Sequence, residues 1–326
     1  MKFRTEIAVA PLRRPIGYGE RILTLGSCFA DALRERLEEA KFRVGGNFAG
    51  PLFNPASIAD ALERAAAGTP YTLGELGRSA DGNRFSFDTA TRFDDPDADV
   101  VLARCNEALG RLREALSAAD RLVITFGTAW VYRLADTGAV VANCHREPAA
   151  RFRRERLAVA EIADRWSELL EGLLAGRQVI LTVSPVRHLG DGLEGNAVSK
   201  AVLRLAADEL AARHPDRVHY FPAYEILTDD LRDYRFYADD LVHPSPRAVE
   251  YVWERFAEAA FDATTRERIE TVRRLTAFCR HTPRHAGSEA DRRACSERLA
   301  ELERLQQAWK IDFSYEIARL KARISR

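Results

Sequence analysis

The segment Ile22-Leu-Thr-Leu-Gly-Ser-Cys-Phe-Ala30 decides the fold class of this chain. Its first four residues are apolar or β-branched, which predicts a short strand that ends at Gly26. After this glycine, apolar residues recur every four positions, at Phe29, Leu33 and Leu37, and this spacing predicts a helix. A strand that passes directly into a helix is typical of a parallel α/β domain.

The same alternation of short apolar runs and helical patterns continues along the chain. Further strands are predicted around Val44 and at 122–126, 179–183 and 217–221, helices at 57–65, 98–118, 158–174, 196–212 and after His243, and hairpin insertions at 71–93 and 131–141. Ser57 is expected to cap the helix that it begins. We therefore expect an α/β fold of three layers, α/β/α, around a parallel central sheet.

The character of the chain changes near residue 261. Beyond it the β-type runs end, the charge density rises, and amphipathic helices are predicted at 266–278 and 297–310. We therefore expect an α/β domain at residues 1–260 and a helical C-terminal appendage at residues 261–326.

Composition excludes several classes of protein. The 326 residues carry 49 Lys and Arg against 49 Asp and Glu, whereas a nucleic-acid-binding protein normally has a basic excess, so we expect no nucleic-acid partner. The N-terminus lacks an apolar leader and no run of about 18 apolar residues occurs, so we expect no membrane span. The five cysteines are scattered without a C-x-x-C pair, which suits a reducing cytoplasm.

Two residues that can act as nucleophiles, Ser27 and Cys28, stand between the first strand and its helix. In open α/β sheets, ligands bind at the carboxyl ends of the strands. A thiol in the first helical turn lies at the positive end of the helix dipole, which favours the thiolate and predicts a lowered pKa for Cys28. The alternative is that Ser27 is only an N-cap and Cys28 a small buried side chain.

A carboxylate and an imidazole are combined in the segment Asp240-Leu-Val-His243-Pro-Ser-Pro246. Ser245 followed by a proline is a good N-cap, so this segment is expected to be a tight loop just before a helix. Asp240 can then fold back onto His243 and orient the imidazole, as in a catalytic triad. The alternative is a surface turn.

Glycine turns that follow two other strands supply candidates for an oxyanion hole. Asn47 and Gly50 follow the second strand, and Gly127 and Thr128 follow the strand at 122–126. Backbone N–H groups at such turns can stabilise a developing oxyanion, although glycine at strand ends is also ordinary turn chemistry.

In chain order, these features resemble the SGNH, or GDSL-like, hydrolase superfamily. Gly26-Ser-Cys-Phe-Ala30 resembles the signature of the GSCFA family within it, and the similarity spans about residues 1–260. The resemblance implies that His243 is the catalytic histidine, that Asp240 orients it, and that Gly50 is the oxyanion glycine.

The sequence departs from the superfamily at two positions. The nucleophilic serine of the superfamily falls on Cys28, and Ser27 takes the place of its aspartate, so either residue is a candidate nucleophile, with Cys28 favoured. The oxyanion-hole asparagine falls on Ala129, so its role must pass to Thr128 or to another group, or be lost.

Three further residues are candidates for substrate contact. His145 lies in Asn143-Cys-His-Arg-Glu-Pro148, which also resembles a stretch of the GSCFA family, and a plain surface loop is the alternative. Arg187 and His188 follow the strand at 179–183, at the same edge of the sheet as the other candidates.

We therefore expect a bacterial, cytoplasmic acyl-transfer enzyme, an esterase or an O- or N-acyltransferase, that acts on a small-molecule or glycan acyl substrate. The alternative is a binding or scaffold protein on a degenerate SGNH fold. We expect no metal and no cofactor, apart from an acyl donor such as an acyl thioester if the enzyme is a transferase. The helical tail is a candidate surface for homo-oligomer formation.

Overall fold

The computed structural model describes residues 5–284 and 287–325 and has a central parallel sheet. The five strands of this sheet are β1 (Arg21–Gly26), β2 (Arg43–Gly46), β5 (Arg121–Phe126), β9 (Gln178–Val183) and β10 (Val218–Tyr220). They lie in the order β10-β9-β5-β1-β2, so the chain leaves β1 toward one edge, returns, and continues toward the other edge from β5. This reversal places a topological switch point between β1 and β5, where open α/β sheets bind their ligands.

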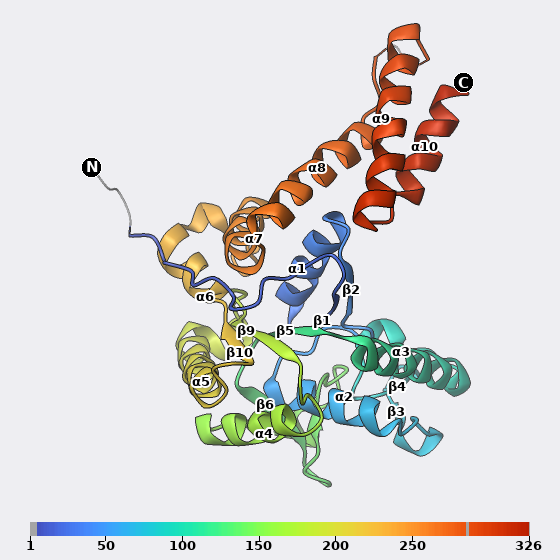
Figure 1. Ribbon diagram of the computed structural model, residues 1–326. Helices are drawn as coiled ribbons and strands as arrows, with labels where there is room; N and C mark the ends of the chain where they lie inside the picture. The colour runs from blue at the N-terminus through green and yellow to red at the C-terminus, as the bar shows by residue number, and fades with distance from the viewer. Residues whose placement is uncertain (1–4, 285–286, 326) are drawn as a thin grey trace.

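Helices cover both faces of the sheet and confirm the predicted three layers (Figure 1). One face carries α1 (Cys28–Glu39), α6 (Ala223–Glu225) and α7 (Pro246–Ala260), and the other carries α2 (Pro55–Ala67), α3 (Ala98–Ala118), α4 (Val159–Glu171) and α5 (Gly192–Arg213). Successive residues of β1 divide between these faces, since Ile22 packs in the first core and Leu23 and Leu25 in the second.

The N-terminal cap of α2 differs from the prediction. Asn54, not Ser57, is the N-cap, and its Oδ1 accepts the Ser57 N–H at 2.7 Å. Pro55 occupies the first helical position, where its fixed backbone angle suits the helix and its missing N–H costs nothing. The predicted cap at Ser57 is therefore wrong by one helical turn.

Both hairpin insertions are present. β3 (Gly77–Arg78) and β4 (Arg84–Phe85) form a short antiparallel pair, and β6 (Trp130–Leu134) pairs with β7 (Val140–Val141). A further strand that was not predicted, β8 (Phe152–Arg156), pairs with β6 along its whole length. Its highly charged sequence lacks apolar alternation because the strand is largely exposed.

The C-terminal helices form an arm that extends away from the sheet (Figure 1). This arm comprises α8 (Ala263–Arg280), α9 (Glu289–Trp309) and α10 (Ser314–Ile324), of which α10 was not predicted. Phe261 stacks on Phe42 with ring centroids 4.9 Å apart, and Lys41 pairs with Glu316 at 2.8 Å. The arm is thus joined to the α/β core through its base, and the division at residue 260 stays a prediction.

Short helical turns complete the chain. Turns of 3-10 helix lie at Leu73–Glu75, Thr91–Phe93, Ala149–Arg151, Leu189–Asp191 and Tyr234–Phe236, and a π-helical turn lies at Ile226–Leu231. Among the described residues, no helix is both long enough and apolar enough to cross a membrane.

Candidate active site

The turn from β1 into α1 separates the two candidate nucleophiles. Ser27 is the N-cap of α1, is only 1% exposed, and accepts the Phe29 N–H on its Oγ at 3.3 Å. Cys28 is the first residue of the helix and is half-buried. Gly26 has a φ of +136°, and a Cβ there would lie 2.1 Å from the Thr125 carbonyl oxygen. Glycine therefore lets β1 end against β5 and present Cys28 at the edge of the sheet.

The environment of Cys28 does not lower its pKa. Burial raises the pKa of the thiol above its ordinary value, the residue's own backbone N–H lowers it, and Asp31 in the first helical turn raises it. The prediction of a lowered pKa is therefore wrong, because desolvation outweighs the helix N-terminus. A reaction at this sulfur needs a base that removes the proton during the attack.

A base of this kind is available in the loop before α7. The Nδ1 atom of His243 lies 2.7 Å from Oδ2 of Asp240, which confirms the predicted contact. Oδ1 of Asp240 accepts the backbone N–H groups of Val242 at 2.9 Å and of His243 at 3.0 Å. These N–H groups and the imidazole lower the pKa of Asp240 to about 2. Nε2 of His243 has no hydrogen-bond partner within the described chain, so it is free to accept a proton.

Arg187 ties this loop to the loop that follows β9. Its backbone N–H donates to the Val242 carbonyl at 3.2 Å, and its guanidinium donates to the Leu241 carbonyl at 3.3 Å. The guanidinium carbon also lies 4.0 Å from the centroid of the Tyr237 ring. In this arrangement, Arg187 holds the His243 loop in place, while its predicted contact with substrate stays a prediction.

The glycine turn after β2 is held by internal hydrogen bonds. The Gly50 N–H donates to the Asn47 carbonyl at 2.9 Å. The Asn47 side chain accepts the Gly26 N–H at 3.0 Å and donates to Asp31 at 3.1 Å. Asn47 therefore braces the nucleophile turn, and the predicted oxyanion role of Gly50 requires its N–H to leave the present acceptor.

The turn after β5 is also internally bonded. The N–H groups of Gly127 and Thr128 both donate to the Phe53 carbonyl at 2.8 Å. The Thr128 hydroxyl lies 3.0 Å from the Ser199 hydroxyl. A Cβ on Gly127 would lie 3.1 Å from the Cβ of Ser27, so this turn packs directly against the nucleophile turn. The N–H groups of Gly127 and Thr128 thus already have an acceptor within the protein, and their role in an oxyanion hole stays a prediction.

His188 lies near the turn after β5, because its ring contacts Phe53, which accepts the N–H groups of that turn. Its ring meets the Phe53 ring edge-on at 5.6 Å between centroids, and its backbone N–H donates to Asn196 at 3.0 Å. Burial, and then the charges of Lys200 and His243, lower the pKa of His188 to about 4. Its Nε2 atom is buried and has no hydrogen-bond partner within the described chain.

Lys200 is a functional candidate that was not predicted. This residue of α5 is 1% exposed, and its ammonium donates to the carbonyls of Gly127 at 2.6 Å and Ser184 at 2.7 Å. No carboxylate in the described chain pairs with it, and burial lowers the pKa of Lys200 to about 7. The sequence contains a signal for this burial, because the helical spacing places Lys200 on the same face as the apolar residues Leu203 and Leu210.

His145 occupies a closed structural network away from these groups. Its Nδ1 lies 3.1 Å from the Asp94 carboxylate, and its Nε2 lies 3.0 Å from the Thr89 carbonyl. Its ring stacks on Phe85 with centroids 4.5 Å apart. Both ring nitrogens are thus occupied, which favours a role in stability over the predicted substrate contact.

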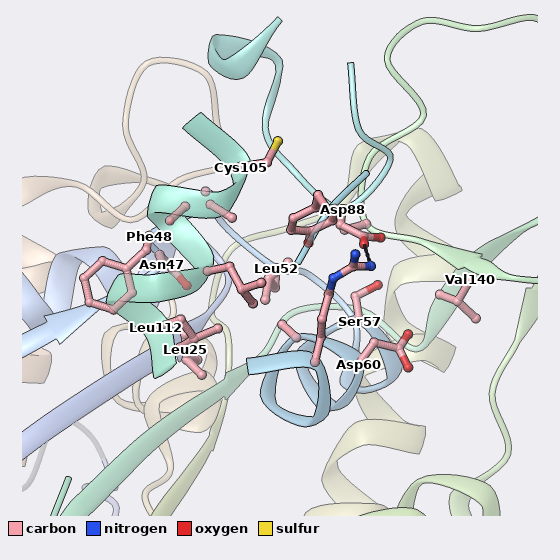
Figure 2. Close-up of a pocket in the computed structure, with 18 residues that line it drawn as sticks. Leu25, Asn47, Phe48, Leu52, Ser57, Asp60, Asp88, Cys105, Leu112 and Val140 are labelled. Atoms are coloured by element: carbon pink, nitrogen blue, oxygen red, sulfur yellow. Dashed lines mark ion pairs between the residues drawn. The ribbon is translucent and has the colours of Figure 1, made fainter. Parts of the chain in front are cut away.

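A cavity of about 40 Å³ lies between α2 and α3, beside the turn after β2 (Figure 2). Asn47 and Gly50 are part of its wall, and Leu25, Leu52 and Leu112 make much of the rest apolar. Its polar end holds Asp88, which pairs with a neighbouring arginine (Figure 2). The cavity borders the predicted oxyanion turn and is not lined by Cys28 or His243.

Apart from His145, the predicted groups therefore follow the carboxyl ends of the central strands or contact residues that do, but in the described chain no hydrogen bond links the base to either nucleophile. Within the described residues, no hydrogen bond joins His243 to Cys28 or to the Ser27 hydroxyl. Also within those residues, no three His, Cys, Asp or Glu side chains are close enough together to hold a metal ion.

Comparison with protein families assigns the chain to one family. No curated protein matches the chain. The family model of the GSCFA family matches residues 21–256, which is more than half of the 326 residues and includes the turn at Cys28 and the Asp240–His243 loop. The chain belongs to the GSCFA family.

Proposed function

We propose that this protein is an acyl-transfer enzyme of the SGNH, or GDSL-like, hydrolase superfamily, with Cys28 as its nucleophile. The observation that carries the proposal is the 2.7 Å contact between Asp240 and His243 in the loop before α7. A carboxylate that orients an imidazole is the base of a nucleophilic triad. The loop is bonded to Arg187, which follows the carboxyl end of β9, and Cys28 follows the carboxyl end of β1 in the same sheet.

Cys28 is a better nucleophile than Ser27 in this arrangement. The Ser27 hydroxyl is buried and caps α1, whereas the Cys28 side chain is partly accessible. A thiol is also the easier nucleophile for a histidine to activate at neutral pH. Because burial raises the pKa of Cys28, His243 must take the proton as the sulfur attacks.

The proposed reaction has two transfers. In the first, Nε2 of His243 removes the Cys28 proton, the sulfur–carbon bond forms, and the carbonyl electron pair moves onto the oxygen. Collapse of this intermediate expels the leaving group, which takes the proton from His243, and leaves an acyl thioester on Cys28. In the second transfer, His243 deprotonates the acceptor, which attacks the thioester carbonyl; the carbon–sulfur bond then breaks, and the Cys28 sulfur takes the proton back from His243.

The acceptor determines the class of enzyme. Water makes the protein an esterase, and a hydroxyl or amine of a small molecule or glycan makes it an acyltransferase, for which an acyl thioester is a suitable donor. No part of this chemistry requires a metal, because the thiol and the imidazole supply the nucleophile and the base.

A binding or scaffold protein on a degenerate SGNH fold is the second candidate. The observation that favours it is the engagement of the Gly50, Gly127 and Thr128 N–H groups with acceptors inside the protein. The arm formed by α8, α9 and α10 would then be the interaction surface (Figure 1). In this role, Cys28 would have no special reactivity.

Acylation by p-nitrophenyl acetate distinguishes the two candidates. We expect a burst of p-nitrophenol and an acetyl group on the peptide that contains Cys28, found by mass spectrometry. Cys28→Ala and His243→Ala should abolish the burst, and Ser27→Ala should keep it. Cys144 is a matched control, because it is also a half-buried thiol. Acetylation of Cys144 as fast as Cys28, or no burst, would overturn the enzymatic proposal.

A further inference from the structure

The site lacks the side-chain donor that an oxyanion hole of this superfamily would place after β5. Ala129 stands at that position, and its backbone N–H already donates to the Ser199 hydroxyl at 2.7 Å. The neighbouring Thr128 hydroxyl contacts the Ser199 hydroxyl and accepts the Trp130 N–H at 3.1 Å. Ala129 has no polar side chain, and the Thr128 hydroxyl is already engaged with Ser199 and Trp130 inside the protein.

His188 has the chemistry that this position lacks. Its Nε2 is buried without a partner, and such an atom is costly unless something binds to it. The hydrogen bond from its backbone to Asn196 and the edge contact with Phe53 fix the residue in place. An imidazole held in this way is a preorganised donor or acceptor for a group that enters the site.

The contacts of His188 relate it to both the proposed nucleophile, Cys28, and the proposed base, His243. Its ring packs on Phe53, whose carbonyl accepts the Gly127 and Thr128 N–H groups, and Gly127 packs against Ser27 beside Cys28. On its other side, His188 is close enough to His243 for the two charges to interact. His188 is therefore linked to the nucleophile turn through Phe53 and Gly127, and to His243 through their electrostatic interaction.

Burial and neighbouring charges keep the imidazole of His188 neutral. Burial is the largest cause that lowers its pKa to about 4, and the charges of Lys200 in α5 and of His243 in the neighbouring loop lower it further. At neutral pH the ring therefore carries a single N–H. A neutral imidazole can donate a hydrogen bond to an oxyanion without competing with His243 for the reacting proton.

We propose that His188 is a catalytic residue that donates its imidazole N–H to the oxygen of the tetrahedral intermediate formed on Cys28. The inference rests on the proposed acyl transfer. The oxygen receives the carbonyl electron pair as the sulfur–carbon bond forms and returns it when the leaving group departs. His188 contributes a hydrogen bond throughout and transfers no proton, so the proton balance at His243 is unchanged.

Two reactions of the same thiol test this role. Acylation of Cys28 by p-nitrophenyl acetate passes through an oxyanion, whereas alkylation by iodoacetamide does not. We expect His188→Ala to slow acylation by about 10²- to 10³-fold, as for loss of one oxyanion donor, and to leave the alkylation rate of Cys28 at that of the wild type. His188→Asn should recover part of the acylation rate, because the amide is also a donor.

His219→Ala is the matched control, since His219 is another histidine whose buried Nε2 lacks a partner in the described chain. It lies on β10, at the edge of the sheet, and its loss should change neither rate. An equal fall of acylation and alkylation in both His188 variants, or unchanged acylation in His188→Ala, would overturn the role of His188. No acylation of the wild type would instead overturn the proposed function, and this role with it.

Discussion

The carboxylate of Asp240 holds His243 at two points, through Oδ2 to the imidazole Nδ1 at 2.7 Å and through Oδ1 to the backbone N–H at 3.0 Å. This double contact closes a loop of four residues, in which Leu241 has a left-handed φ of +57°. Because Nδ1 faces a carboxylate, the neutral imidazole carries its proton there and leaves Nε2 as the base. A contact within one short loop thus sets the tautomer of His243.

Asp240→Asn is expected to reduce the kcat of p-nitrophenyl acetate hydrolysis by about 10²- to 10⁴-fold, because an amide can favour the wrong imidazole tautomer. The pKa of Asp240 is lowered to about 2. Its carboxylate therefore stays ionised, and keeps any stability it adds, until the pH falls toward about 2. Asp239→Asn is the control, and an equal loss there would contradict the assignment.

Asp31→Asn is expected to lower the pKa of the Cys28 thiol and to speed its alkylation at neutral pH. Asp31 is a negative charge in the first turn of α1 that raises this pKa. The rate of iodoacetamide labelling against pH, followed by mass spectrometry of the Cys28 peptide, measures the effect. Glu35→Gln removes an exposed charge from the same helix, and a matching shift in that variant would argue against a local effect.

Lys200→Met is expected to remove a rise in stability on the alkaline side of neutrality. The pKa of Lys200 is about 7 in the folded protein against an ordinary 10.5, so between these values the unfolded chain binds more protons. The free energy of unfolding therefore rises with pH there, by at most about 1.4 kcal/mol per pH unit. Urea unfolding across this interval tests it, with Lys321→Met at the surface as the control. Equal slopes for wild type and Lys200→Met would refute it.

Gly127→Ala is expected to impair acylation of Cys28. The added Cβ would lie 2.8 Å from the Phe53 carbonyl oxygen and 3.1 Å from the Ser27 Cβ, so the turn after β5 must move. The new Cβ of Gly110→Ala in α3 would meet no atom within 4 Å apart from the local backbone of its own helix, and this change should stabilise the helix by about 0.5–1 kcal/mol. Thermal unfolding and burst kinetics of the two variants give the comparison, and normal kinetics in Gly127→Ala would contradict the packing argument.

His145→Ala is expected to destabilise the protein by about 1–3 kcal/mol, because it leaves the buried partners of the imidazole without it. Those partners are the Asp94 carboxylate and the Thr89 carbonyl. Alkylation of Cys28 in the folded variant should match the wild type. A stable variant with an altered KM for acyl substrates would instead restore the role in substrate binding.

The elements that could be predicted are those whose signals are local. The apolar spacing of Phe29, Leu33 and Leu37 predicts α1, and all three side chains are buried. The contact between Asp240 and His243 was also predictable, because it depends on a few neighbouring residues and a proline that limits their conformations. Such signals need no knowledge of the rest of the chain.

The features that could not be predicted depend on residues far apart in the sequence. β8 exists because β6 pairs with it, despite its charged sequence, and the ammonium of Lys200 is buried because two strand ends turn their carbonyls toward α5. The pKa of Cys28 also depends on distant residues. The effect of the helix N-terminus is local, but the larger effect is desolvation, to which every group that packs around the sulfur contributes. Short-range backbone and side-chain preferences therefore determined the strands of the central sheet, most of the helices and the Asp240–His243 pair. Burial and long-range packing decided which charges, donors and thiols around that pair are free to act.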